Sequence, residues 1–206
     1  DMGTQQMMSV PYALNAGSVN LRVSNTGDTL YSGGGNYVIV PGISTANTTL
    51  SIGMSYGGGI IAYILQPGDP GYVAGETHGI IAAPSDQSTG IQWGCDGTFV
   101  GGTSTLLGTG AANTAIISAA CAAGTAARLC ADLVLNGYSD WYLPSRDELQ
   151  KLYINILYIG EFPPEVYWSS SENDAYTAWY YFFNFGGNSY AYPKNYEYYV
   201  RAVRSF

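Results

Sequence analysis

Glycine interrupts the apolar segments of this chain at short intervals, and this spacing restricts what the chain can fold into. The sequence of 206 residues contains 27 glycines. Turns that contain glycine or proline separate short β-prone segments, which lie at 37–40, 60–65, 78–84 and 90–95. Segments bounded in this way predict short strands rather than long helices. The first half of the chain is therefore expected to be rich in β-structure.

Two glycine triplets, at 33–35 and 57–59, invite comparison with phosphate-binding loops. Such a loop carries a lysine followed by serine or threonine, and it opens a helix. Neither triplet is followed by these residues, so no nucleotide site is expected.

Alanine and leucine, which favour helices, become frequent in the middle of the chain. Segments 111–121 and 126–135 are predicted to be two helices separated by Gly124. Asn136 and Gly137 are predicted to end the second helix, with glycine in the left-handed position beyond its last turn.

A third helix is predicted to begin at Ser145. Ser145 and Glu148 have the spacing of a capping box, in which each side chain satisfies the other residue's backbone N–H. Apolar side chains then recur at helical spacing and predict a face that packs on the core: Leu149, Leu152, Tyr153 and Leu157.

Asp147 and Glu148 also suggest an acid pair for general acid–base chemistry. Adjacent helix residues point about 100° apart, so the two carboxylates would not converge on one substrate atom. Stabilisation of the helix N-terminus by negative charge is the preferred interpretation.

The chain returns to β-prone sequence after residue 162. Segments 167–171, 178–185 and 199–206 are predicted strands. With strands on both sides of a helical middle, the expected fold class is α+β, with two or three helices packed on small antiparallel sheets.

No catalytic constellation is visible in the sequence. His78 is the only histidine and lacks the partners of a triad or a zinc site, and the serines at 169–171 lie in no GxSxG motif. Asp69, Glu76 and Asp86 offer oxygen ligands for Ca²⁺, but their spacing matches no calcium-binding loop. Neither an enzyme nor a cofactor is expected, and metal binding is left open.

The three cysteines, Cys95, Cys121 and Cys130, allow one disulfide and leave one thiol. Cys121–Cys130 is the first expectation, because a short helical connection can fold back on itself there. Sequence alone does not fix the pairing.

Charge limits the classes of partner. Only 11% of residues are charged and the net charge is −8 with seven Lys and Arg, which argues against binding to nucleic acid or anionic membranes. No run approaches the roughly 20 apolar residues of a membrane span, and no signal peptide follows Asp1. Together with the 19 tyrosines, this favours a mature or trimmed extracellular chain.

Four motifs in a fixed order resemble a known family: GYSDWYLPSRDEL (137–149), YWSSSE (167–172), AW (178–179) and VRAVRSF (200–206). Together they resemble the C-terminal domain of the Legionella collagen-like adhesin. The match extends back through 57–63 and 91–95, so that the resemblance covers about 27–206. It implies a C-type lectin-like fold related to the formylglycine-generating enzymes.

The enzyme relatives of that fold use a paired-cysteine copper site. No such cysteine pair lies near the C-terminal region of this chain, so the resemblance does not carry their activity over. It implies a ligand-binding domain at 27–206, with a variable region at about 168–206. Residues 1–26, which precede the match and show no clear apolar period, are expected to be a tail, a linker or an oligomerisation stem. Trp168, Trp179, Arg201 and Arg204 are assigned to the scaffold.

The stretch from 173 to 198 is similar, more narrowly, to the variable region of proteins diversified by a retroelement. In those systems adenines of a template are randomised, so that asparagine codons become codons for Tyr, Ser, Asp, Gly, Thr, Ala or Phe. Pro193 and Glu197 fit this pattern less well. The residues that fit are the candidate ligand-binding residues: Asn173, Asp174, Tyr176, Thr177, Tyr180, Asn184, Asn188, Ser189, Tyr190, Tyr192, Asn195, Tyr196 and Tyr198.

Tyr, Ser, Asn and Gly are also the residues that antibody loops use for recognition. The expected function is recognition of a protein or glycan on another cell or surface, by a chain carried on a cell surface or a phage particle. An undiversified adhesin domain that binds carbohydrate or glycosaminoglycan is the alternative. A homo-oligomer is possible on this evidence, and the carrier is left open.

Overall fold

The structure is a computed structural model, and it describes residues 22–23, 29–31, 37–39, 49–160, 162–184 and 186–206. Its contacts divide the chain into two compact units, Asp1–Thr49 and Leu50–Phe206. The boundary expected between residues 26 and 27 lies outside the described residues, and so does the tail expected before it, apart from Arg22 and Val23.

The described residues of the first unit form three short strands in the order β1-β2-β3. They are β1 (Arg22–Val23), β2 (Thr29–Tyr31) and β3 (Tyr37–Ile39), and both pairings are antiparallel. The strand predicted at 37–40 is therefore confirmed as β3.

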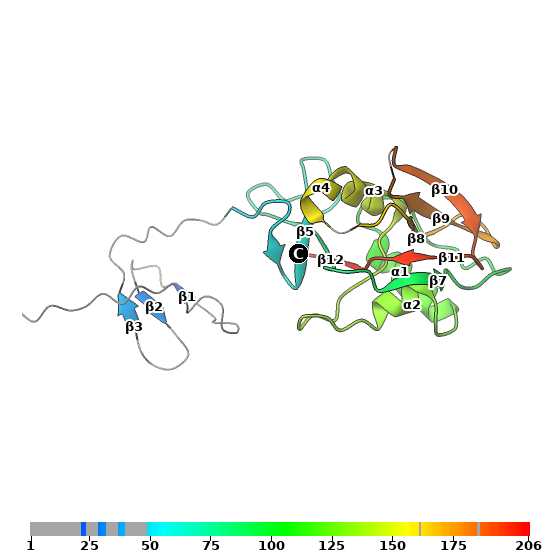
Figure 1. The fold of residues 1–206 in the computed structure, drawn as a ribbon, viewed down its shortest axis with the longest axis horizontal. Coiled ribbons are helices and arrows are strands. Elements are labelled where there is room, and N and C mark those ends of the chain that lie inside the picture. The colour runs from blue at the N-terminus through cyan, green and yellow to red at the C-terminus, as the bar shows by residue number, and fades with distance from the viewer. Residues whose placement is uncertain (1–21, 24–28, 32–36, 40–48, 161, 185) are drawn as a thin grey trace, which may run out of the picture. The chain divides into compact units, whose positions relative to one another are not determined.

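The second unit is built on two sheets (Figure 1). The four-stranded sheet has the order β12-β6-β5-β4 and contains β4 (Ser55–Tyr56), β5 (Gly59–Ile64), β6 (Gly79–Ala82) and β12 (Val203–Ser205). The five-stranded sheet has the order β10-β9-β8-β11-β7 and contains β7 (Ser88–Gln92), β8 (Val166–Glu172), β9 (Thr177–Phe182), β10 (Asn188–Pro193) and β11 (Glu197–Val200). All pairings are antiparallel except that of β11 with β8, so the second sheet is mixed.

Four helices in the second unit cover these sheets. They are α1 (Gly110–Ala120), α2 (Ala126–Ala131), α3 (Arg146–Ile154) and the single turn α4 (Ile156–Ile159). The α+β class is confirmed, with one more short helix than expected. Among the described residues, no helix combines the length and apolar character that a membrane crossing requires.

The five-stranded sheet separates two hydrophobic cores. On β8, Trp168 belongs to the core that includes α2, whereas its neighbour Tyr167 belongs to the core that includes α3. On β9, Ala178 belongs to the core with α2 and Tyr181 to the core with α3. This division follows from the alternation of side chains between the two faces of a strand. Figure 1 shows α2 and α3 on opposite sides of β11.

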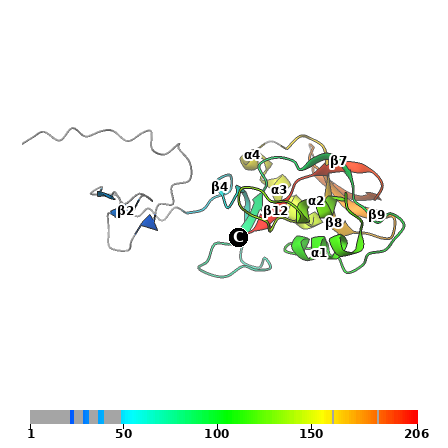
Figure 2. The ribbon, with the colours of Figure 1, turned by 90° about the horizontal axis from the view of Figure 1, so that it is seen from below.

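The β9–β10 hairpin lies at one end of this unit, and β4 with the C-terminus lies at the other (Figures 1 and 2).

The capping box at the start of α3 is confirmed: Ser145 Oγ accepts from the Glu148 N–H, and Glu148 Oε2 accepts from the Ser145 N–H at 2.8 Å. Glu148 is fully buried, so its role here is structural.

Two helix predictions were wrong in their ends. Helix α2 stops at Ala131, and Asn136 and Gly137, both at positive φ (52° and 83°), form a separate tight turn that pairs Leu135 with Tyr138. Asn-Gly with two positive φ angles is a type I′ hairpin turn, not a helix end.

The predicted core face of the third helix also ends early. Helix α3 stops at Ile154, and the Asn155 side chain donates to the Ala62 carbonyl at 2.9 Å. Leu157, expected in the core, is 92% exposed.

The strand predicted at 199–206 is two strands in different sheets. Arg201 and Ala202, which link β11 to β12, are buried. The Arg201 guanidinium donates to the Asp86 carboxylate at 2.6 Å and to the Ala83 carbonyl at 3.1 Å. These bonds hold the chain where it passes from one sheet to the other. Strand β10 was not predicted.

The predicted disulfide was also wrong. Cys95 is bonded to Cys121, and Cys130 is a buried free thiol. Helix α2 directs the Cys130 side chain into the core, where it is fully buried. Cys121 instead caps the end of α1, within reach of the loop that follows β7.

Candidate ligand-binding surface

Five of the candidate residues come together as one group of aromatic side chains. Tyr180 lies on β9, Tyr190 and Tyr192 on β10, and Tyr198 on β11, with Tyr196 in the turn before β11. We call these five residues the tyrosine cluster. Tyr190, Tyr192 and Tyr196 are 54%, 38% and 49% exposed, which is unusual for large side chains so close to one another.

The rings of the tyrosine cluster contact one another directly. Tyr192 lies 4.7 Å from Tyr196 and 6.0 Å from Tyr198 between ring centroids, and Tyr180 lies 5.4 Å from Tyr198 and 6.0 Å from Tyr190. Most pairs are tilted or edge-to-face, the arrangements that aromatic quadrupoles favour. The five rings therefore form one packed group.

Strand register explains why these side chains meet. Tyr190 is paired with Tyr180 across the β10–β9 ladder, and Tyr180 is paired with Trp168 across the β9–β8 ladder. Trp168 is fully buried, and its ring lies 4.7 Å from that of Tyr198. The cluster thus rests on a core tryptophan.

Contact and burial change the acidity of the cluster's phenols. Burial, together with the neighbouring phenols of Tyr192, Tyr180 and Tyr196, raises the pKa of Tyr198 to about 12. Burial also raises the pKa of Tyr180. Tyr180 and Tyr198 therefore present neutral hydroxyl groups near pH 7, each able to donate and accept a hydrogen bond.

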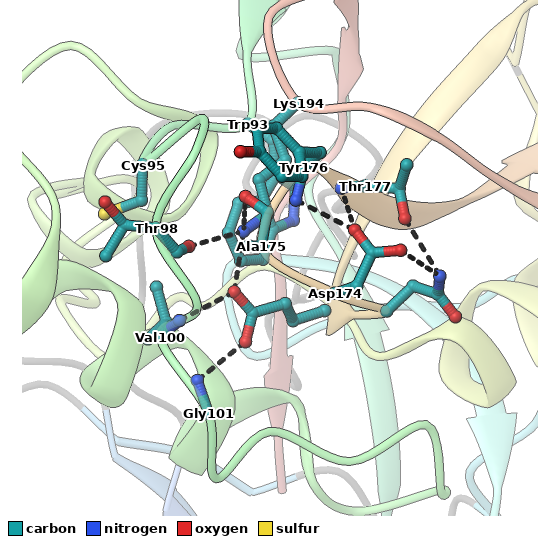
Figure 3. A network of polar contacts seen from close by, with 12 residues as sticks. Trp93, Cys95, Thr98, Val100, Gly101, Asp174, Ala175, Tyr176, Thr177 and Lys194 are labelled. Carbon is teal, nitrogen blue, oxygen red and sulfur yellow. Dashed lines mark hydrogen bonds and ion pairs between the residues drawn. The ribbon is translucent and has the colours of Figure 1, made fainter.

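The turn between β8 and β9 holds four more of the candidate residues. Asp174 Oδ1 accepts from the N–H groups of Tyr176 and Thr177 at 2.8 and 2.7 Å, and the Asn173 amide donates to Thr177 Oγ1 (Figure 3). The bonds from Tyr176 and Thr177 hold the pKa of Asp174 below its usual value. The turn is thus closed by its own side chains, and Tyr176 is left 64% exposed.

This turn lies beside the turn that carries Tyr196 and the exposed Asn195. The Lys194 N–H donates to the Tyr176 carbonyl at 2.9 Å, and Lys194 Nζ donates to the Ala175 carbonyl at 3.1 Å. The two turns and the tyrosine cluster therefore form one continuous surface.

The remaining three candidates are not part of that surface. Asn184, Asn188 and Ser189 lie at the other end of the β9–β10 hairpin, where Asn188 is paired with Phe182. Ser189 is paired with Tyr181, whose side chain belongs to the core on the α3 side. These residues lie near the tyrosines in the sequence, but they do not join the tyrosine cluster in the folded chain.

Beneath the two turns lies a buried ion pair that the sequence did not predict. Lys194 Nζ is 2.6 Å from Glu172 Oε1, and the two side chains are 0% and 1% exposed. The signal available in the sequence was the lysine's place between aromatic residues in a stretch with no other Lys or Arg from 173 to 198.

The loop after β7 completes the surroundings of this pair (Figure 3). Glu172 accepts from the N–H groups of Val100 and Gly101 at 2.8 and 2.7 Å, and Lys194 donates to the Thr98 carbonyl at 2.9 Å. The Cys95–Cys121 disulfide fixes the start of that loop. A framework loop distant in sequence therefore supports the candidate surface.

A shallow apolar hollow adjoins the cluster on its framework side. Ile91 on β7 is paired with Tyr198, and it lines a cavity of about 340 Å³ together with Leu129 and Leu133. Arg128 and Asp132, joined at 2.9 Å, stand at the same cavity. These residues were not singled out in the sequence.

The residues considered for catalysis or metal binding are engaged elsewhere. His78 contacts Glu76 at 2.8 Å, Asp69 accepts from Tyr63, and Asp86 pairs with Arg201. Ser169, Ser170 and Ser171 are fully buried and hydrogen-bonded to neighbouring segments. Within the described part of the chain, no three His, Cys, Asp or Glu side chains form a group that could hold a metal ion.

The four residues assigned to the scaffold are buried or held by contacts with other side chains. Trp168 and Arg201 are buried, and Arg204 makes two 2.7 Å hydrogen bonds to Asp140. Trp179 lies under the Arg146 guanidinium, 5.1 Å from ring centroid to charge centre.

Fold and surface together define a class: an α+β domain of C-type lectin-like type that displays an aromatic surface on a rigid sheet. A sequence model described as the Lcl C-terminal domain matches residues 83–204. The chain therefore belongs to the Legionella collagen-like protein C-terminal domain family. That membership indicates a surface adhesin or ligand-binding domain. No curated protein matches the chain.

Proposed function

We propose that the chain is a secreted or surface-displayed recognition protein, and that the tyrosine cluster with its two adjoining turns is the ligand-binding surface. The observation that carries this proposal is the cluster itself: five tyrosines in mutual contact, three of them substantially exposed, on a buried tryptophan. Tyrosine gives large contact area at low cost in conformational entropy. Binding, not catalysis, is the activity that such a surface supports.

The charge of the surface favours a neutral or cationic ligand. From 173 to 198, Lys194 is the only Lys or Arg, and its charge is buried and paired with Glu172. Asp174 and Glu197 are exposed. Among the described residues of 173–198 a sulfated polysaccharide would meet no accessible cation, and Arg128 at the adjoining hollow is paired with Asp132. A protein epitope, or a neutral sugar stacked on tyrosine, is therefore the proposed ligand class.

We also propose that this surface is diversified by a retroelement. All thirteen candidate side chains are at least partly exposed, so substitution at these positions removes little core packing. The buried framework residues on either side, Trp168 and Arg201 among them, would keep the fold constant while the surface changes.

Parallel probing of a glycan array and an array of cell-surface proteins tests the function. Wild type and the Tyr190→Ala/Tyr192→Ala/Tyr196→Ala variant are applied at the same concentration, with immobilised heparin as a separate arm. We expect wild-type signals on protein or neutral glycan spots that the variant loses. Binding to heparin, retained by the variant, would overturn the proposed ligand class and favour the glycosaminoglycan-binding adhesin.

A further inference from the structure

Lys194 lies in the segment that forms the proposed ligand-binding surface, but its side chain is buried. Asn195 and Tyr196, which follow it, are exposed, whereas the Lys194 side chain is 0% exposed. Lysine is almost never fully buried unless its charge is paired. A lysine enclosed in this way is part of the interior of the fold, although it lies within a surface segment.

The Lys194 ammonium group is held by three separate segments. It donates to Glu172 Oε1 at the end of β8, to the Ala175 carbonyl in the β8–β9 turn, and to the Thr98 carbonyl. Its three N–H donors are thereby matched by three acceptors. The Trp93 ring, 4.8 Å away at its centroid, covers the charge.

The backbone of Lys194 is fixed as firmly as its side chain. Its N–H donates to the Tyr176 carbonyl at 2.9 Å, and its carbonyl accepts from the Trp93 N–H at 3.0 Å. The residue is therefore tied to the β8–β9 turn through its N–H and to the buried framework residue Trp93 through its carbonyl. Tyr192 and Tyr196, two positions away in either direction, must project outward from this fixed point.

We propose that Lys194 is a positioning residue of the ligand-binding surface: through Glu172 and the 98–101 loop it fixes the β10–β11 turn, and with it the orientation of Tyr192, Tyr196 and Tyr198. This inference rests on the proposed function. It assigns Lys194 no contact with the ligand. An ordered surface binds more tightly because less conformational entropy is lost when the ligand arrives.

A purely structural role makes a different prediction from a positioning role. Lys194→Met leaves the Glu172 carboxylate buried without its cation, which destabilises the whole unit. Lys194→Met/Glu172→Gln removes both charges, and such paired replacements restore much of the stability. The tethers from Lys194 Nζ to the Thr98 and Ala175 carbonyls stay lost in this double variant.

Hydrogen exchange of the double variant tests the proposal without any ligand. We expect amides of 192–198 to exchange on the order of tenfold faster than in wild type, while β5 and β6 keep their protection and the melting temperature stays near that of wild type. Lys151→Met is the matched control, because Lys151 lies on α3 over the Tyr63 ring, and it should leave 192–198 unchanged.

Two results would overturn the proposal. Unchanged protection of 192–198 in the double variant would show that Lys194 does not position the turn. Loss of protection in β5 and β6 equal to that in 192–198 would show a general structural role only. Because this readout needs no ligand, failure of the array experiment would refute the proposed function and leave the positioning result standing.

Discussion

The buried ring of Trp168 lies 4.7 Å from the ring of Tyr198, so that one aromatic contact joins the hydrophobic core to the tyrosine cluster. Trp168→Ala should lower the free energy of unfolding by about 3–5 kcal/mol, as expected for a truncated core tryptophan. Denaturant titration measures this.

The matched control for this change is Tyr176→Ala, since Tyr176 is 64% exposed. It should alter stability by no more than about 0.5 kcal/mol. Equal losses in the two variants would mean that the division between scaffold and surface is wrong.

The disulfide is expected to stabilise the fold and to hold the loop under the ion pair. Cys95 and Cys121 are 26 residues apart, and closing a loop of that size is worth about 3–4 kcal/mol. Replacing both with serine should reduce stability by that amount and speed exchange in 98–101.

Peptide mapping with thiol labelling checks the pairing itself. Burial raises the pKa of the Cys130 thiol, so the thiol should react only after unfolding. Recovery of a Cys121–Cys130 peptide from protein unfolded at acid pH would contradict the structure.

The tyrosine cluster should limit stability at alkaline pH. The Tyr198 pKa is raised from 10.0 to about 12 in the folded chain. A group whose folded pKa lies above its unfolded pKa favours folding below the unfolded value, and this contribution is lost as the pH rises through the folded value. Stability should therefore fall between pH 10 and pH 12.

Phenolate absorbance during an alkaline titration follows this process. Tyr198→Phe removes one such group and should reduce the late-ionising part of the curve, to which Tyr63 also contributes because burial raises its pKa to about 12. Superimposable curves for the variant and wild type above pH 10 would refute the assignment.

The sequence predicted much of the fold because its signals were local. The capping box of Ser145 and Glu148 needs only adjacent residues, and it is present in the structure. Short apolar segments beside glycine-containing turns likewise predicted β5 and β6 in the right places, and the segment 167–171 predicted β8. The family resemblance, carried by ordered motifs, gave the C-type lectin-like class.

The wrong disulfide and the missed strand arose where distant segments decide the structure. Cys121 pairs with Cys95, which β7 and its loop bring close, and no spacing within 121–130 reveals this. Strand β10 has alternating exposure in a stretch with few aliphatic residues, so it lacks the apolar signal of a buried strand. The register of β10 on β9, also non-local, decides which tyrosines meet.

Lys194 shows the same limit within the site. Its residue type and its neighbours indicate a surface position. Three acceptors from other segments enclose it, and only the folded arrangement brings them together.

Lys194 should tolerate substitution far less than the exposed residues around it. In a display library randomised at Tyr192, Lys194, Asn195 and Tyr196, clones selected for protease resistance should retain lysine at 194 and show varied residues at the other three positions. Free variation at 194, or enrichment of tyrosine at 192 and 196 without any ligand, would contradict the division into anchor and replaceable surface.

The most direct test of the central claim compares ligand binding and melting temperature in one pair of proteins. For the strongest array ligand, the Tyr190→Ala/Tyr192→Ala/Tyr196→Ala variant should lose binding, while the lost ring contacts cost only about 1–2 kcal/mol and the melting temperature falls by a few degrees. Undiminished binding would contradict the claim that the tyrosine cluster is the recognition surface, and so would unfolding of the variant at room temperature.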